Sequence, residues 1–193
     1  MVMQTLPTYR KYIVASVCGL LMAIFAVNGG NAQGAGADMD KLFAELADPE
    51  NPNWERAQNQ ILREWAKSGS PAFDLLLSRG ERAMEEGDYQ AAIEHLTALT
   101  DQAPDFAEGW NARATAYYLA GFYGPSIADI QRVLALEPRH FGALDGLGMI
   151  LQEIGRKEEA LKALRASLAI HPHQDSIEQA AEALTRELSG TEL

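Results

Sequence analysis

Residues 104–138 decide the fold of this chain and read PDFAEGWNARATAYYLAGFYGPSIADIQRVLALEP. Two segments rich in apolar residues are separated by Gly121, and Pro138 closes the second segment. Glycine accepts the left-handed conformation that a tight turn between antiparallel helices requires. Proline ends a helix because it lacks a backbone N–H and disfavours helical geometry in the residue before it. The stretch therefore predicts a helix, a turn at Gly121 and a second helix.

The same pattern recurs on both sides at a period of 34 residues, and four columns of residues share this spacing. They are Pro104, Pro138 and Pro172; Gly87, Gly121 and Gly155; Gly80, Ala114 and Gly148; and Ala92, Ser126 and Ala160. Small residues at the centres of paired helices let the helices approach closely, while large apolar residues fill the remaining space. The body of the chain is thus predicted to be a stack of helical hairpins.

These columns resemble the signature of the tetratricopeptide repeat (TPR), a helix–turn–helix unit of 34 residues. The second unit matches it with Trp110, Ala114, Tyr117, Gly121, Ser126, Ile130 and Pro138. The resemblance implies an all-α solenoid with three repeats, at 73–106, 107–140 and 141–174. It covers about half of the chain.

The flanks of the repeats are also predicted to be helical. Residues 175–189 have an apolar stripe at helical spacing and are expected to form a capping helix, because a repeat stack exposes apolar surface at its ends. Residues 38–72 read as a helical hairpin that lacks the repeat columns, and three roles stay open for it: a degenerate repeat, an N-terminal cap or a dimerisation surface. Trp54 and Trp65 share one helix face there and are expected to lie in a core.

The first residues resemble a secretory signal peptide. Arg10 and Lys11 precede an apolar stretch over residues 12–27, and small residues follow. Cleavage is expected after Ala32, which leaves a linker at 33–37, or after Ala37. The alternative is an uncleaved inner-membrane anchor that leaves the body facing the periplasm. Export to the bacterial periplasm is the predicted localisation, and the membrane is a partner only through an uncleaved leader.

Composition excludes several classes of function. The formal net charge of −11 disfavours nucleic acid as a partner, because phosphate binding needs a basic face. With Cys18 as the single cysteine, the chain has neither an internal disulfide nor a thiolate zinc site. No phosphate loop, GxGxxG, HExxH or GxSxG motif occurs, so we expect no enzyme and no cofactor. His171 and His173 flank Pro172, but no third ligand is predicted near them, so no metal site is expected.

The resemblance also implies a concave groove lined by the first helix of each repeat. Its expected peptide-binding residues are Asp74, Leu77, Glu81, Met84, Asn111, Thr115, Tyr118, Asp145, Met149 and Gln152. Some TPR proteins hold a C-terminal carboxylate with basic residues in this groove, and no Lys or Arg stands at these positions here. An acidic and apolar groove suits a basic or amphipathic segment, with Asn111 and Tyr118 at its centre.

Two arginines depart from the repeat pattern. Arg79 and Arg113 occupy positions where the repeat usually has leucine, and Asp129 lies on the facing helix of the second hairpin. We predict a structural ion pair between Arg113 and Asp129. An anion site formed by Arg79 and Arg113 is the alternative, and it is less favoured because pairing between the helices satisfies the arginine.

The predicted function is therefore a non-catalytic scaffold or adaptor of the bacterial cell envelope that binds a peptide segment in its groove. The alternative is a periplasmic assembly factor or chaperone that holds unfolded clients, such as apo-cytochromes or outer-membrane proteins. Self-association through residues 38–72 is a third expectation.

Overall fold

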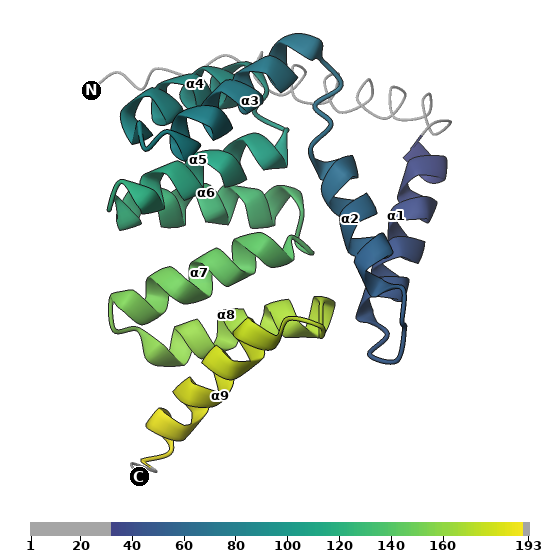
Figure 1. Ribbon diagram of the computed structural model, residues 1–193, viewed down its shortest axis with the longest axis vertical. Coiled ribbons are helices and arrows are strands. Elements are labelled where there is room, and N and C mark those ends of the chain that lie inside the picture. The colour runs from purple at the N-terminus through teal and green to yellow at the C-terminus, as the bar shows by residue number, and fades with distance from the viewer. Residues whose placement is uncertain (1–31, 191–193) are drawn as a thin grey trace, which may run out of the picture. The chain divides into compact units, whose positions relative to one another are not determined.

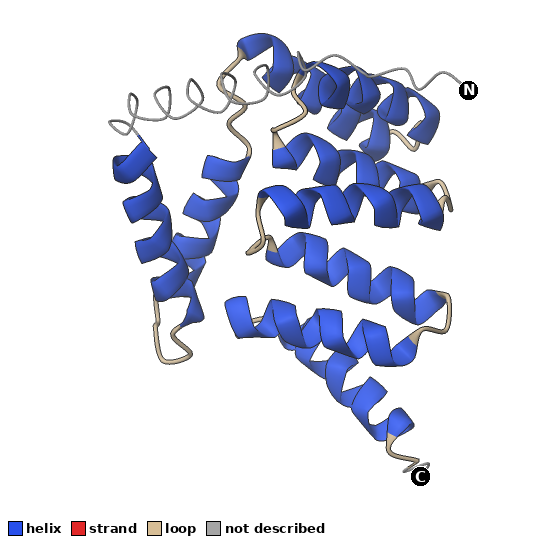
Figure 2. Ribbon diagram, turned by 180° about the vertical axis from the view of Figure 1, so that it is seen from behind, coloured by secondary structure: helices blue, strands red, loops and turns tan. Residues whose placement is uncertain are grey.

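The computed structural model describes residues 32–190, and every regular element in this range is an α-helix (Figures 1 and 2). In chain order they are α1 (Ala32–Ala47), α2 (Trp54–Trp65), α3 (Pro71–Glu85), α4 (Tyr89–Gln102), α5 (Ala107–Leu119), α6 (Tyr123–Leu136), α7 (Phe141–Glu153), α8 (Lys157–Ile170) and α9 (Asp175–Leu188). The described residues from Asp40 onward form one compact unit.

The predicted leader lies outside the described residues except for Ala32, where α1 begins. Residues 33–37, expected to be a linker, are helical in the structure. Alanine at positions 32, 35 and 37 favours a helix while Gly34 and Gly36 disfavour it, so intrinsic propensity does not explain this extension of α1. Within residues 32–190 no helix has both the length and the apolar character needed to cross a bilayer.

Helices α3 to α8 form successive antiparallel hairpins, each stacked on the next, and α9 packs against α8 (Figure 1). The all-α fold predicted from the repeat columns is confirmed. Helix α3 begins at Pro71, two residues before the expected start of the first repeat, because proline suits the first turn of a helix, where its missing N–H is not needed. Helix α9 begins at Asp175, and Gln174 occupies its N-cap position.

The glycine columns have the two physical roles that their positions predicted. Gly87, Gly121 and Gly155 follow the first helix of each hairpin with φ of 77°, 78° and 80°, where a side chain would be strained. Gly148 instead lies inside α7, and a Cβ added there would come within 2.3 Å of a side-chain carbon of Leu164. The hairpin of α7 and α8 can therefore pack this closely only with glycine at position 148.

The core of the solenoid runs from hairpin to hairpin rather than forming one central mass. Leu96 and Leu99 of α4 are fully buried against α3 and α5, and Leu164 and Leu184 join α8 to α9. Ser126 in α6 donates its hydroxyl to the backbone carbonyl of Ala114 at 2.7 Å, so this buried polar side chain is satisfied. The stacking of successive hairpins places α5 and α7 side by side.

The N-terminal hairpin packs on turns between repeats. A further repeat would stack on α3 and α4, but Trp65 of α2 stacks on His140 and Trp54 stacks on His173, in the turns before α7 and α9. The buried apolar residues of this hairpin are Leu42, Phe43, Leu46, Ala57 and Ile61.

Trp54 and Trp65 were expected in a core, and both are partly buried against the repeat turns. Leu62, next to the buried Ile61 on α2, is 40% exposed. Helix α2 meets the turns through its two tryptophan rings.

Candidate functional site

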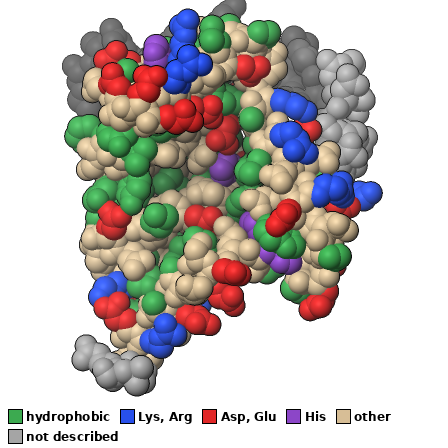
Figure 3. Space-filling view, in the orientation of Figure 1, with side chains coloured by type: hydrophobic (Ala, Val, Ile, Leu, Met, Phe, Trp, Pro, Cys, Tyr) green, Lys and Arg blue, Asp and Glu red, His purple; other side chains and the backbone are tan. Residues whose placement is uncertain are grey.

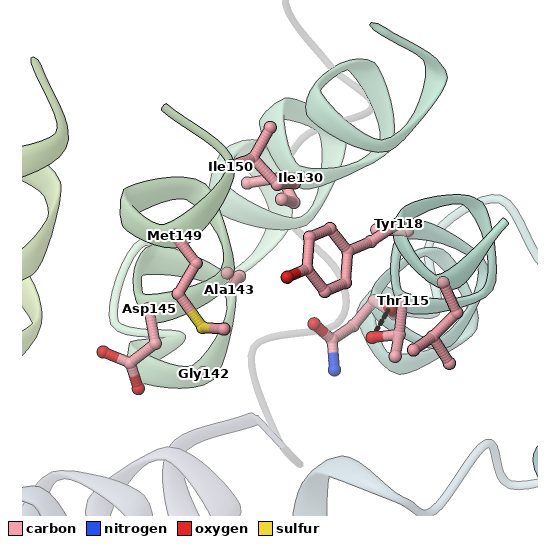
Figure 4. A pocket seen from close by; sticks show the side chains of 12 residues that line it. Thr115, Tyr118, Ile130, Gly142, Ala143, Asp145, Met149 and Ile150 are labelled. Atoms are coloured by element: carbon pink, nitrogen blue, oxygen red, sulfur yellow. Dashed lines mark hydrogen bonds between the residues drawn. The ribbon is translucent and has the colours of Figure 1, made fainter. Parts of the chain in front are cut away.

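A cavity of about 290 Å³ opens between α5 and α7 on the face formed by the first helices of the repeats (Figure 4). Its wall is mostly apolar and includes Ala114, Leu119, Ile130, Ala143, Met149 and Ile150. Met149 is 45% exposed and Leu119 is 42% exposed. Their exposure leaves apolar area that a ligand could cover.

Five of the predicted groove residues lie around this cavity: Asn111, Thr115, Tyr118, Asp145 and Met149. The close view shows the Tyr118 ring extending from α5 into the space opposite Ala143 and Met149 of α7 (Figure 4). Asn111 and Asp145 stand 34 residues apart, so they occupy equivalent positions on neighbouring first helices. The repeat geometry brings both polar groups to one site.

The other predicted groove residues lie elsewhere. Leu77 is 5% exposed and packs in the core beneath α3, α4 and α5, so its assignment to the groove surface is wrong. Its apolar side chain turns inward because that core offers apolar partners, whereas Asn111 and Asp145 at the equivalent positions are polar. Met84 is partly buried against the same core. Gln152 is exposed near the end of α7.

Asp74 braces the start of α3 through one of its carboxylate oxygens. Its carboxylate accepts a hydrogen bond from the backbone N–H of Ser68 at 3.2 Å and another from the Ser68 hydroxyl. Both bonds fix the chain just before Pro71, so we assign Asp74 to the joint between the N-terminal hairpin and the repeats.

Acidic residues gather beside the cavity. The pKa of Glu81 is raised, first by burial and then by the negative charges of Glu108 and Glu85. In the space-filling view, acidic side chains cluster on the upper part of the visible face, above a hollow lined with apolar side chains (Figure 3). A cation placed here would relieve the repulsion between these carboxylates.

Two hydrogen bonds and a ring stack connect the cavity to the N-terminal hairpin. The Asn111 amide donates to Glu108 Oε1 at 2.9 Å, and His140 Nε2 lies 3.2 Å from Glu108 Oε2. The other ring nitrogen of His140, Nδ1, accepts a hydrogen bond from the backbone N–H of Ala143 at 3.1 Å. Nε2 therefore carries the ring proton and donates the hydrogen bond to Glu108. The face of the His140 ring stacks on the Trp65 ring of α2.

This connection was missed from sequence. His140 is not among the residues predicted for the site, yet it is the N-cap of α7, at the position that Phe106 and Gln174 occupy before α5 and α9. The repeat spacing could have identified it as a cap. Its pairing with Trp65 had no sequence signal, because the two residues are 75 positions apart.

The two residues of the predicted ion pair are joined by two hydrogen bonds. Arg113 donates from Nε to Asp129 Oδ2 at 2.7 Å and from Nη2 to Asp129 Oδ1 at 2.9 Å. Its Nη1 donates to the Thr100 hydroxyl at 2.8 Å, and the guanidinium lies over the Trp110 ring at 4.8 Å. Arg113 is thus fully engaged inside the stack, and the alternative anion site with Arg79 does not form.

His171 and His173 also have partners within the protein. His171 Nε2 lies 3.0 Å from Gln58 Oε1, and His173 Nε2 lies 3.0 Å from the backbone carbonyl of Asp48. In residues 32–190 no group of three or more potential metal ligands gathers. The HPH segment therefore belongs to the contact with the N-terminal hairpin.

Comparisons with known proteins agree with this architecture. A family model described as tetratricopeptide repeat matches residues 77–124 and 120–175. A TPR repeat-containing protein of Rhizobium etli is 37% identical over 153 residues, which cover 79% of this chain and 75% of that protein.

Two solved structures illustrate the likeness in fold. The first TPR of Spaghetti (RPAP3), bound to the HSP90 peptide SRMEEVD, is similar with a TM-score of 0.60 and 22% identity, covering 62% of this chain and 95% of that one. The crystal structure of MamA is similar with a TM-score of 0.58 and 21% identity, covering 84% of this chain and 85% of that one.

Proposed function

The chain belongs to the tetratricopeptide-repeat family, and we propose that it is a non-catalytic interaction module that binds a segment of another protein in the groove over α5 and α7. The observation that carries this proposal is the cavity between these helices. It combines exposed apolar side chains, Met149 and Leu119, with polar groups aligned by the repeat. Concave sites of this composition bind ligands by burying apolar groups and orienting them with a few polar contacts.

The RPAP3 domain of similar fold is bound to a peptide that ends in two glutamates, a valine and an aspartate. A peptide of that charge does not suit this groove, where Glu81, Glu108 and Asp145 are acidic. We therefore propose a partner segment that is basic or amphipathic.

The proposed setting is the bacterial periplasm, and this part of the proposal rests on the sequence of the leader. The test is to fractionate cells and determine the N-terminus of the protein. A periplasmic protein that begins after Ala32 or Ala37 agrees with export and cleavage. A membrane-bound protein that retains its first residues indicates the uncleaved anchor. An unprocessed protein in the cytoplasm contradicts the proposed periplasmic localisation.

The groove is tested by a crosslinking pull-down from envelope extract. The variant Asn111→Ala with Tyr118→Ala removes an amide and an aromatic ring from the cavity. Its matched control, Gln131→Ala with Phe122→Ala, removes the same kinds of group from exposed positions outside the cavity. We expect the first variant to lose a partner that the control retains. Retention of every partner by the groove variant would show that the groove is not the binding site.

The same experiment distinguishes the scaffold from the alternative, a chaperone for unfolded clients. A scaffold retains one partner in fixed proportion, and unfolded proteins do not displace it. A chaperone releases its clients when an excess of an unrelated unfolded protein is added. We favour the scaffold because the cavity is small and walled by packed helices, which suits one defined segment better than many.

A further inference from the structure

The hydrogen-bonding capacity left around the cavity is mostly that of acceptors. The Thr115 hydroxyl donates to the backbone carbonyl of Asn111 at 3.0 Å, and the Tyr118 hydroxyl donates to Glu153 Oε1 at 2.6 Å. Each hydroxyl has then used its one donor and keeps only lone pairs for a ligand. Asn111 has committed one of its amide N–H groups to Glu108, which leaves its oxygen and one N–H.

Asp145 adds a carboxylate to these acceptors. Its Oδ1 is shielded from solvent and has no hydrogen-bond partner. Burial raises the pKa of Asp145 to about 6, against the lowering influence of Ser167 and His140. Such a carboxylate is held at a cost in the free protein, and the positive charge of a ligand beside the cavity wall would offset part of that cost.

From this arrangement we infer the chemistry of the partner, an inference that rests on the proposed function: the cavity takes a bulky aliphatic side chain whose neighbour in the partner's sequence is a lysine or arginine. The aliphatic group would cover Met149 and Leu119. The cation would lie beside Asp145 on the cavity wall or beside the acidic cluster of Glu81, Glu85 and Glu108, which Asn111 joins to the cavity through its hydrogen bond to Glu108. Charge complementarity selects this occupant, because an acidic segment would place like charges beside acceptors that have no proton to offer.

Gly146 provides a way to close the cavity without changing any polar group. It lies on the cavity wall inside α7, and a Cβ added there would meet only Ile130 Cδ1, at 3.8 Å. Gly146→Leu therefore places its side chain in the cavity. The matched control is Ala135→Leu, which adds a similar side chain at an exposed position of α6 outside the cavity wall.

The test uses the purified full chain and three synthetic fluorescent peptides of nine residues, measured by fluorescence anisotropy. One has a central leucine between two lysines, one replaces the leucine by alanine, and one replaces both lysines by glutamates. Burial of a leucine side chain and pairing of a charge should each change affinity about tenfold or more, so the first peptide should bind tightest. Gly146→Leu should abolish this binding, and Ala135→Leu should not.

The role of Asp145 is tested separately with Asp145→Asn. This variant should lose about tenfold in affinity for the lysine peptide and keep its preference for leucine over alanine. Glu94→Gln, which removes one negative charge from the exposed face of α4, is the control and should bind like the original protein.

Three results overturn the inference. One is equal or tighter binding of the glutamate peptide, and a second is unchanged binding by Gly146→Leu. Failure of all three peptides to bind also contradicts it, because each feature the inference requires is present in the first peptide. These results are distinct from failure of the proposed function: a natural partner still lost in the pull-down with the Asn111 and Tyr118 variant would keep the groove as a binding site with a different chemistry.

Discussion

The Trp65 ring lies parallel to the His140 ring, with centroids 4.1 Å apart and an angle of 7° between the planes. This stack joins α2 to the turn before α7, and through Glu108 it joins the N-terminal hairpin to the groove. Residues before the repeats are thereby fixed beside the proposed binding site. The relationship predicts that the hairpin stabilises the solenoid and influences the groove.

Trp65→Ala should lower the free energy of unfolding by about 2 kcal/mol, because the partly buried ring loses its contacts with His140 and Phe141. Urea denaturation followed by circular dichroism measures the change. Leu62→Ala on the same helix is the control, since Leu62 is exposed, and it should change stability by less than about 0.5 kcal/mol. Equal effects of the two substitutions would mean that the stack does not hold the hairpin.

Two glycines of α7 should respond in opposite ways to alanine. Gly146→Ala should stabilise the protein by up to about 1 kcal/mol, because the site has room for a Cβ and alanine favours the helix. Gly148→Ala should destabilise it by about 1–3 kcal/mol, because its Cβ would overlap Leu164 and the hairpin would have to open. Thermal unfolding of both variants checks the pair. A stabilising Gly148→Ala would refute the close crossing of α7 and α8.

The ion pair of Arg113 and Asp129 should be a major structural contact. Asp129→Ala leaves the buried guanidinium without its carboxylate and should cost about 3–5 kcal/mol. Glu159→Ala removes the partner of Arg156 at the surface, where both side chains are half exposed, and should cost less than about 1 kcal/mol. Chemical denaturation of the two variants gives the comparison. A small effect of Asp129→Ala would favour a role for Arg113 other than structure.

Stability should depend on pH through two groups that act in opposite directions. Burial first, and then the charge of His173, lowers the pKa of His171 to about 4, so its contribution to stability is lost as pH falls from 6.5 towards 4. The pKa of Asp145 is raised to about 6, so its contribution is complete at low pH and is lost as pH rises from 4 to 6. In the wild-type protein these two effects partly cancel.

Asp145→Asn should reveal the pH dependence of stability that His171 causes, because it removes the group whose effect opposes it. Its unfolding free energy should rise more steeply between pH 4 and 6.5 than that of the wild type, and at pH 7 it should be more stable by on the order of 1 kcal/mol. Urea titrations at several pH values measure both. A variant with the same pH profile as the wild type would show that Asp145 carries no unfavourable charge.

The sequence predicted the parts of the fold that repeat. The columns that contain Pro104, Gly121 and Gly148 marked the ends, turns and crossings of the helices. Each column has one physical requirement that is repeated in successive hairpins. Helices α3 to α8 follow from these columns to within a few residues. The position of the N-terminal hairpin did not follow, because Trp54 and Trp65 meet histidines far away in the chain through ring contacts that leave no periodic pattern.

The candidate site was predicted in part for the same reason. Asn111 and Asp145 lie at repeat-equivalent positions and reach one cavity, whereas Leu77 at the corresponding position of α3 is drawn into the core by its apolar side chain. The excess of hydrogen-bond acceptors around the cavity could not be predicted from the sequence either. It depends on which partners Thr115 and Tyr118 find for their hydroxyl protons.

The central claim is that the cavity between α5 and α7 holds a segment of a partner protein. The most direct measurement places a photocrosslinking amino acid at Met149, on the cavity wall, or at Ala135, outside it, in cells that produce the protein. The account predicts a defined adduct from position 149 that disappears when Gly146→Leu is added, and no such adduct from position 135. Absence of an adduct at 149, or an adduct that persists in the Gly146→Leu background, would contradict it.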